Sequence, residues 1–272
     1  MVAEADALVR LAQAGAPHAL AIYFVVLAVL LLAGWVGWWA VQRWMVPREA
    51  GAVPAPWLLG VRLALGFGAI VGCGWVFAEV AEALQAQVAL GAADQAIADA
   101  IRTGVPAAAL RVFAALTHLA DTATLTGLCI VVALALVIAG RRWLALAWVA
   151  AVSGNALLNH TLKQVFERAR PLHDDGLVAA HGFSFPSGHS SGAVVAYGML
   201  AYVAMRFVAP RWHAALLLGA IALAFTIGAS RMFLRVHFAS DVLAGFASGT
   251  AWLAVCIGSV ELTRWYRGRR AT

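Results

Sequence analysis

Residues 19–41 read ALAIYFVVLAVLLLAGWVGWWAV, an unbroken apolar run that ends at Gln42 and Arg43. About 20 apolar residues in a helix span the hydrocarbon core of a bilayer, so this run alone is long enough to cross a membrane. It is too long for the core of a signal peptide, and it follows Glu4 and Asp6 rather than the basic start of an export signal. The stretch therefore predicts a membrane-spanning helix.

The rest of the chain repeats this pattern. Of the 272 residues, 63% are hydrophobic and only 12% are charged, more apolar surface than a soluble domain of this size buries. Six further apolar runs, mostly uncharged, are Leu58–Ala78, Ala123–Ala139, Trp143–Leu162, Ser190–Val208, Ala214–Ala229 and Phe238–Leu262. We therefore expect an all-α, polytopic membrane helix bundle with seven spans.

The positions of lysine and arginine predict the orientation, because translocated loops are poor in both. Seven spans put the two termini on opposite sides. With a cytoplasmic C-terminus, the inner side holds Arg43, Arg48, Arg141, Arg142, Arg206, Arg211, Arg264, Arg267, Arg269 and Arg270. The outer side then holds Arg10, Arg102, Arg111, the cluster from Lys163 to Arg170, Arg231 and Arg235. The excess of lysine and arginine on the inner side is small. It becomes clearer if the outer lysines and arginines form a binding site and are not counted as orientation signals.

The net charge and the positions of the cysteines limit which ligands, metals and macromolecules the protein is expected to bind. We interpret the formal net charge of +6 as membrane topology together with a phosphate site, and not as a nucleic-acid surface. Cys73, Cys129 and Cys256 lie inside apolar runs, where cysteine behaves as a small hydrophobic residue. We expect no disulfide and no metal–thiolate site.

One long segment, Val80 to Asp121, separates the second and third spans. Its spacing favours short amphipathic helices at the outer interface over a solvated connector, and the apolar residues at that spacing are Ile97, Ile101, Val105, Leu110, Phe113 and Leu116. We expect two parts in the chain. Residues 1–57 add one span and the linker Pro47–Pro56, and residues 58–272 form the membrane core.

Three polar clusters lie at the ends of apolar spans, and the first follows the fourth span. It reads KQVFERARP from Lys163 to Pro171. Pro171 disfavours helix at Arg170, so we expect the helix to stop there with Lys163 and Arg170 about two turns apart on one face. Both cations would then point at one anion. Taken alone, the pattern favours long side chains that snorkel to the interface.

The second cluster, Pro186-Ser187-Gly188-His189, comes directly before the fifth span. Ser187 suits the cap of that helix, Gly188 lets the backbone approach a ligand, and free N–H groups at a helix N-terminus suit a phosphate oxygen. His189 would lie beside the bound anion. Taken alone, these residues favour an ordinary turn and helix start.

The third cluster, Ser230-Arg231, His237 and Asp241, lies where the sixth span meets the seventh. His237 and Asp241 are four residues apart, so on a helix they share a face and the carboxylate accepts the proton of one imidazole nitrogen. The other nitrogen is then left as a nucleophile or base. Such a pair alone is more often a structural hydrogen bond.

Topology places the three clusters on one side of the membrane. Between His189 and Ser230 the chain crosses and returns through two spans, joined by a short turn near Ala209 and Pro210. A loop of fourteen residues, Leu172 to Phe185, joins the first cluster to the second. We therefore expect the clusters to form one pocket.

Together the clusters resemble the signature of the type 2 phosphatidic acid phosphatase (PAP2) superfamily, with the form Lys-x6-Arg-Pro, Pro-Ser-Gly-His and Ser-Arg-x5-His-x3-Asp. The fixed positions are all present, at Lys163, Arg170, Pro171, Pro186, Ser187, Gly188, His189, Ser230, Arg231, His237 and Asp241. The resemblance covers about residues 58 to 262 and implies a six-helix membrane core, to which the first span is an addition. It implies a bacterial lipid phosphatase, which we expect in the inner membrane. The orientation predicted from lysine and arginine places its site on the periplasmic or exterior side.

The resemblance also implies a role for each residue. His237 attacks phosphorus and forms a phosphohistidine, Asp241 holds its tautomer, and His189 protonates the leaving oxygen. Lys163, Arg170, Arg231, the Ser187 hydroxyl and the Gly188 N–H surround the equatorial oxygens. Pro171, Pro186 and Ser230 are structural positions of the motif. No metal or other cofactor is expected, and Asp174 and Asp175 are expected on an outer loop facing water.

The expected substrate is an amphiphile that enters from the membrane lipids. Undecaprenyl diphosphate, phosphatidylglycerol phosphate and phosphatidic acid all fit the resemblance, and an outward site favours the diphosphate of a cell-wall carrier lipid. One alternative is a lipid phosphotransferase with the same site. Another is a non-enzymatic anion or lipid transporter, which would place charges at mid-span rather than at span ends.

Overall fold

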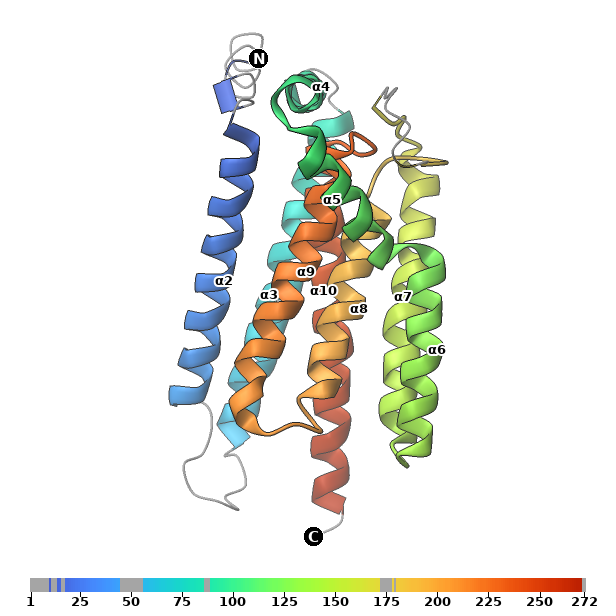
Figure 1. The fold of residues 1–272 in the computed structure, drawn as a ribbon. Coiled ribbons are helices and arrows are strands. Elements are labelled where there is room, and N and C mark those ends of the chain that lie inside the picture. The colour runs from blue at the N-terminus through green and yellow to red at the C-terminus, as the bar shows by residue number, and fades with distance from the viewer. Residues whose placement is uncertain are drawn as a thin grey trace.

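The computed structural model describes residues 10, 14–15, 18–44, 56–85, 89–171, 178 and 180–270, and these contain helices and no strand. The helices are α2 (Ala19–Trp44), α3 (Pro56–Gln85), α4 (Ala89–Gly104), α5 (Ala107–Thr117), α6 (Thr122–Ile138), α7 (Arg142–Phe166), α8 (Gly188–Ala204), α9 (His213–Phe233) and α10 (Ala239–Arg270), with the short 3-10 helices η2 (His118–Ala120) and η3 (Pro210–Trp212). The predicted all-α bundle is confirmed (Figure 1). Of the predicted linker, residues 47–55 lie outside the described residues, as do Asp174 and Asp175.

Each predicted span coincides with a helix whose ends differ from the predicted ones by up to eight residues. By length and apolarity four helices qualify as spans, namely Ala19–Trp44, Leu63–Gln85, Pro210–Phe233 and Ala239–Arg267, and α5 with α6 forms a bent fifth. Helices α6 and α8 have 17 residues each, fewer than the roughly 20 of a straight span. α7 is less apolar because it carries Asn155, Asn159 and Lys163. In Figure 1, α2, α6, α8 and α10 run one way through the bundle and α3, α7 and α9 return.

The segment between the second and third spans forms α4 and α5, as the apolar spacing predicts. Ile101, Val105 and Phe113 are buried in one cluster with Phe233 and Val236. α4 lies across one end of the bundle, whereas α5 runs obliquely along α9 toward α6 (Figure 1). The axes of the α5–η2 segment and α6 differ by 46°. α5 packs its apolar face on α9 instead of lying across the end of the bundle, and the interfacial position predicted for the two helices stays a prediction.

Two glycines of α10 bring the starts of α8 and α10 together. A Cβ atom added to Gly245 would lie 2.6 Å from the carbonyl oxygen of Ser187, and one on Gly249 would lie 2.8 Å from the Cα of Ser191. Small residues four apart allow two membrane helices to approach this closely. The contact therefore holds the second polar cluster beside Asp241 of the third.

The first span, α2, packs on the outside of the core. Its Tyr23 hydroxyl lies 2.7 Å from the Thr226 hydroxyl of α9, and the Tyr23 ring stacks on Phe225 at 5.6 Å between centroids. Other large apolar side chains of α2, such as Phe24 and Leu32, are exposed. This distribution fits a peripheral helix whose other faces meet lipid. The boundary at residue 57 stays a prediction.

Candidate active site

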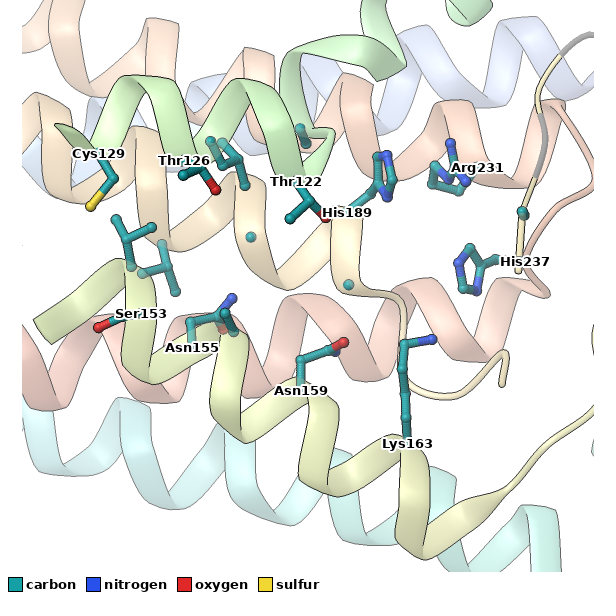
Figure 2. A pocket seen from close by; sticks show the side chains of 18 of the residues that line it. Thr122, Thr126, Cys129, Ser153, Asn155, Asn159, Lys163, His189, Arg231 and His237 are labelled. Carbon is teal, nitrogen blue, oxygen red and sulfur yellow. The ribbon is translucent and has the colours of Figure 1, made fainter. Parts of the chain in front are cut away.

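The three polar clusters converge on one cavity of about 540 Å³. Its walls come from α6, α7, α8 and α9 and from the loops before α8 and α10 (Figure 2). One end carries cations and histidines, which are Lys163, Arg170, His189, Arg231 and His237; the other end is largely apolar, with Leu125, Cys129, Ile130, Val152 and Val195. Ile130 is 54% exposed on the outer surface of α6. The cavity is thus polar at one end and apolar at the other, and its apolar end reaches a side chain that is exposed on the outside of the bundle.

His237 lies in the turn between α9 and α10, and its ring is oriented from both sides. The side chain is 2% exposed. Nδ1 lies 3.4 Å from an Asp241 oxygen and 3.5 Å from the Ser184 hydroxyl, and Nε2 lies 3.0 Å from a guanidinium nitrogen of Arg170. Because Arg170 only donates, Nε2 is the unprotonated nitrogen. The helical placement predicted for the His237–Asp241 pair is wrong for His237, since α10 begins at Ala239.

Asp241 is fully buried and accepts several hydrogen bonds besides its contact with His237. One oxygen accepts from Arg168 at 2.6 Å, and the other accepts from the Phe238 N–H at 2.9 Å and from the Ser184 hydroxyl. These donors stabilise the ionised carboxylate and fix its position. Arg168 and Ser184 were not among the predicted site residues, although both lie within or beside the motif segments.

Asp94 of α4 extends this network from a distant part of the chain. Its carboxylate accepts from Arg168 at 2.8 Å and from the backbone N–H of Ser240 at 3.1 Å, and it is 2% exposed. The Arg168 guanidinium also lies 4.3 Å from the centroid of the Phe238 ring. Arg168 therefore sits between two buried carboxylates and ties α4 to the start of α10.

Lys163 and Arg170 meet at one carbonyl rather than on one helical face. The helix stops at Phe166, where Glu167 adopts a left-handed conformation with φ of 43°, so the predicted end at Arg170 is wrong. Lys163 donates to the carbonyl oxygen of Phe183, and Arg170 donates to the same oxygen at 3.2 Å. Arg170 also holds the carbonyls of His181 and Gly182, at 3.0 Å each. The loop before α8 thereby brings both cations to the cavity.

Arg231 is a buried cation with unused hydrogen-bonding capacity. It is 2% exposed and donates to the Thr117 hydroxyl of α5 at 2.8 Å. Its Nε has no hydrogen-bond partner among the described residues. Burying a guanidinium is unfavourable unless an anion or acceptor compensates. Arg231 lies on the cavity wall, where an anionic ligand would supply both the negative charge and a hydrogen-bond acceptor.

His189 has an acidic partner that the sequence did not reveal. Its Nε2 lies 3.0 Å from one oxygen of Asp121, and Nδ1 of His118 lies 2.7 Å from the other. The two imidazoles thus contact both carboxylate oxygens of Asp121. Asp121 holds His189 through Nε2 and leaves Nδ1 of that ring available for proton transfer.

Of the remaining motif residues, Gly188 lines the cavity, and the others contact the protein around it. The Ser187 hydroxyl accepts from the Ser190 N–H at 3.4 Å and the Ser190 hydroxyl at 2.9 Å, so it caps α8 and does not line the cavity. Gly188 lines the cavity, with its missing Cβ site 2.9 Å from Asn159 Oδ1. Ser230 donates to the carbonyl of Ile227 at 2.6 Å. Pro171 and Pro186 are buried.

Burial and neighbouring charges keep His237 neutral. Burial lowers its pKa most, Arg170 and Arg231 lower it further, and Asp241 opposes them, so the net pKa lies well below the usual value. A neutral imidazole is nucleophilic at neutral pH through its unprotonated nitrogen, which in His237 is the Nε2 that Arg170 contacts. The arrangement can therefore attack an electrophilic centre that Lys163, Arg170 and Arg231 surround.

Comparison with known proteins identifies the family. A family model described as the PAP2 superfamily matches residues 142–265. Phosphatidylglycerophosphatase B of Bacillus subtilis is 31% identical over 159 residues, which are 57% of this chain and 77% of that protein. Lipid A 1-phosphatase of Rhizobium johnstonii is 36% identical over 110 residues, 37% of this chain and 41% of that protein.

A solved structure shows the same fold. The crystal structure of a transmembrane PAP2 type phosphatidylglycerolphosphate phosphatase from Bacillus subtilis matches with a TM-score of 0.65 and 30% identity, and covers 71% of this chain and 96% of that chain. Residues 142–265, which the family model matches, include the segments that carry the three polar clusters. The chain therefore belongs to the PAP2 superfamily and is an integral membrane phosphatase of that superfamily.

Proposed function

We propose that this protein hydrolyses the phosphomonoester or diphosphate of a membrane lipid through a phosphohistidine on His237. The observation that carries the proposal is a single cavity in which a neutral, oriented imidazole faces three cationic side chains. The apolar end of the same cavity suits the chains of a lipid. Phosphatidylglycerol phosphate, phosphatidic acid and undecaprenyl diphosphate have the required head and tail.

The reaction follows from the two histidines. His189 acts as the imidazolium, with its Nε2–H held by Asp121. Nε2 of His237 attacks phosphorus in line while the bond from phosphorus to the lipid oxygen breaks, and the Nδ1–H of protonated His189 gives that oxygen its proton. A water molecule then attacks phosphorus and loses a proton to the same nitrogen of His189. The phosphorus–nitrogen bond breaks, which releases inorganic phosphate and restores neutral His237.

The cations stabilise the charge that spreads over the equatorial oxygens. Arg231 offers its unpartnered Nε, and Lys163 lies across the cavity from it. Arg170 contacts Nε2 of His237 at 3.0 Å, where an incoming phosphate oxygen would lie. We propose that Arg170 exchanges this contact for the phosphate oxygen and so frees the nucleophile.

The proposed setting is the inner membrane of a bacterium, with the site on the periplasmic or outer side and the C-terminus in the cytoplasm. The distribution of arginine supports this orientation. Cysteine labelling from outside intact cells tests it, since a residue near Gly182 should react and one near the end of α10 should not.

Phosphate release from a panel of lipid phosphates by the purified protein in detergent tests the activity directly. Release that depends on His237 supports hydrolysis. A transporter would release none, and a phosphotransferase would move radiolabelled phosphate into a second lipid instead of inorganic phosphate.

Activity should survive removal of metal ions and be inhibited by vanadate. Lys163, Arg170 and Arg231 supply the positive charge that a metal ion provides in many phosphoryl transfers. Vanadate forms a five-coordinate oxyanion that resembles the transition state. The measurement is phosphate release with EDTA, with EDTA plus magnesium, and with vanadate. Loss of activity in EDTA that magnesium restores would contradict the mechanism.

Asp121→Asn should slow the reaction about 100-fold with a lipid monoester, because His189 loses the charge that orients it as general acid. With p-nitrophenyl phosphate, whose leaving group needs little protonation, the loss should be much smaller. His118→Ala is the milder comparison, since it keeps the contact between Asp121 and His189. Equal losses on both substrates would show that Asp121 only supports the fold.

A further inference from the structure

The cavity continues beyond its cationic end as a polar strip inside the bundle. Asn155, Asn159 and Lys163 follow one another at intervals of four residues on α7, and Figure 2 shows them on the side of the helix that faces the cavity. Asn155 is near the middle of the 25 residues of α7, which coincides with the fourth predicted span. Polar side chains are unfavourable there and are typical of functional sites.

Asn155 has a polar atom without a partner. The side chain is 5% exposed, its Nδ2 donates to the Ser191 hydroxyl at 3.4 Å, and no described residue bonds to its Oδ1. The orientation of the amide follows from Ser191, whose own proton points to the Gly188 carbonyl at 3.4 Å. The Ser191 oxygen is therefore left to accept from Asn155. A buried amide oxygen without a donor is unfavourable unless a ligand supplies one.

We propose that Asn155 Oδ1 accepts a hydrogen bond from a hydroxyl or amide N–H of the substrate lipid. Asn155 would thereby favour lipid phosphates that carry such a donor between the phosphate and the apolar chains. The inference rests on the proposed function, because the phosphate must occupy the end of the cavity near Lys163 and Arg231.

The spacing indicates where the donor lies. Eight residues of helix separate the Cα atoms of Asn155 and Lys163 by roughly 12 Å, so the donor is several bonds from phosphorus. A sugar or an N-acylated backbone presents hydroxyl or N–H groups at that distance. The ester carbonyls of a diacylglycerol and the chain of a polyprenol present none. The site thus ranks saccharide or amide lipids above phosphatidic acid and the polyprenyl carrier, and the free glycerol hydroxyl of phosphatidylglycerol phosphate places that lipid in the favoured group.

Asn155→Leu tests the proposal with two phosphomonoesters, a 2,3-diacylglucosamine 1-phosphate and dioleoylphosphatidic acid. The glucosamine lipid carries hydroxyl and amide donors, and the second lipid carries none outside its phosphate. The variant should lower kcat/KM about 10-fold for the glucosamine lipid, as expected for one buried hydrogen bond, and less than about twofold for phosphatidic acid. Its thermal stability should be unchanged or higher, because an unsatisfied buried oxygen is gone.

Thr161→Val is the matched control on the same helix. Thr161 is exposed, lies outside the cavity and donates back to the Leu157 carbonyl at 3.0 Å, so this variant should change neither substrate. Equal losses on both lipids with Asn155→Leu would overturn the proposal, as would wild-type protein that hydrolyses phosphatidic acid but not the glucosamine lipid. Absence of release from every lipid phosphate would instead overturn the proposed function itself.

Discussion

His237→Ala should abolish phosphate release, with a loss of about 10⁴-fold or more, because the variant has no group at that position to form the covalent intermediate. Asp241, Ser184 and Arg170 all converge on this one ring, and no other histidine has such surroundings among the described residues. The measurement is phosphate release from a lipid phosphate by purified variants in detergent.

The control for this prediction is His160→Ala, which removes an exposed histidine of α7 outside the cavity. That variant should keep the wild-type rate. Substantial activity in His237→Ala, in protein that unfolds at the wild-type temperature, would rule out His237 as the nucleophile.

Arg231→Met should reduce kcat/KM about 10³-fold without reducing stability. The rate falls because one donor to the transition-state oxygens is lost from a buried site. Stability is maintained because the wild-type guanidinium is 2% exposed, has an Nε without a partner among the described residues, and is replaced by an apolar chain of similar volume. Thermal unfolding and phosphate release measured on the same samples separate the two effects.

Arg206→Met is the control, because it makes the same substitution at an arginine outside the cavity. Arg206 pairs with Glu261, far from the cavity, so its loss should lower stability slightly and leave activity unchanged. If Arg231→Met lost stability and activity together, Arg231 would be a structural cation rather than a phosphate ligand.

The spans were predictable because they follow from local composition. Apolar runs long enough to cross a bilayer can hardly form anything but helices there, since their backbone groups must be paired within the segment. The ends of the helices were less predictable. Arg170 lies outside the helix, as Pro171 predicts. α7 nevertheless ends earlier, at Phe166, because Glu167 adopts a left-handed conformation. Lys163 and Arg170 still converge, but through the carbonyl of Phe183.

The motif positions of the site were predictable, whereas their supporting residues were not. Asp94 and Asp121 lie far along the chain from Arg168 and His189, and no local pattern relates the members of each pair. Their contacts arise only when α4 crosses the end of the bundle and α5 bends into α6. Arg168 occupies a variable position of the motif, so the signature gave no reason to choose it.

Trapping the phosphoenzyme tests the central claim most directly. Protein mixed with a lipid labelled with ³²P in its phosphate and quenched in alkali should retain a label that acid removes, as a phosphohistidine does. Trypsin should release that label on residues 236–264, a peptide whose single histidine is His237. Label on a different peptide, or rapid phosphate release with no labelled protein at any quench time, would contradict the account.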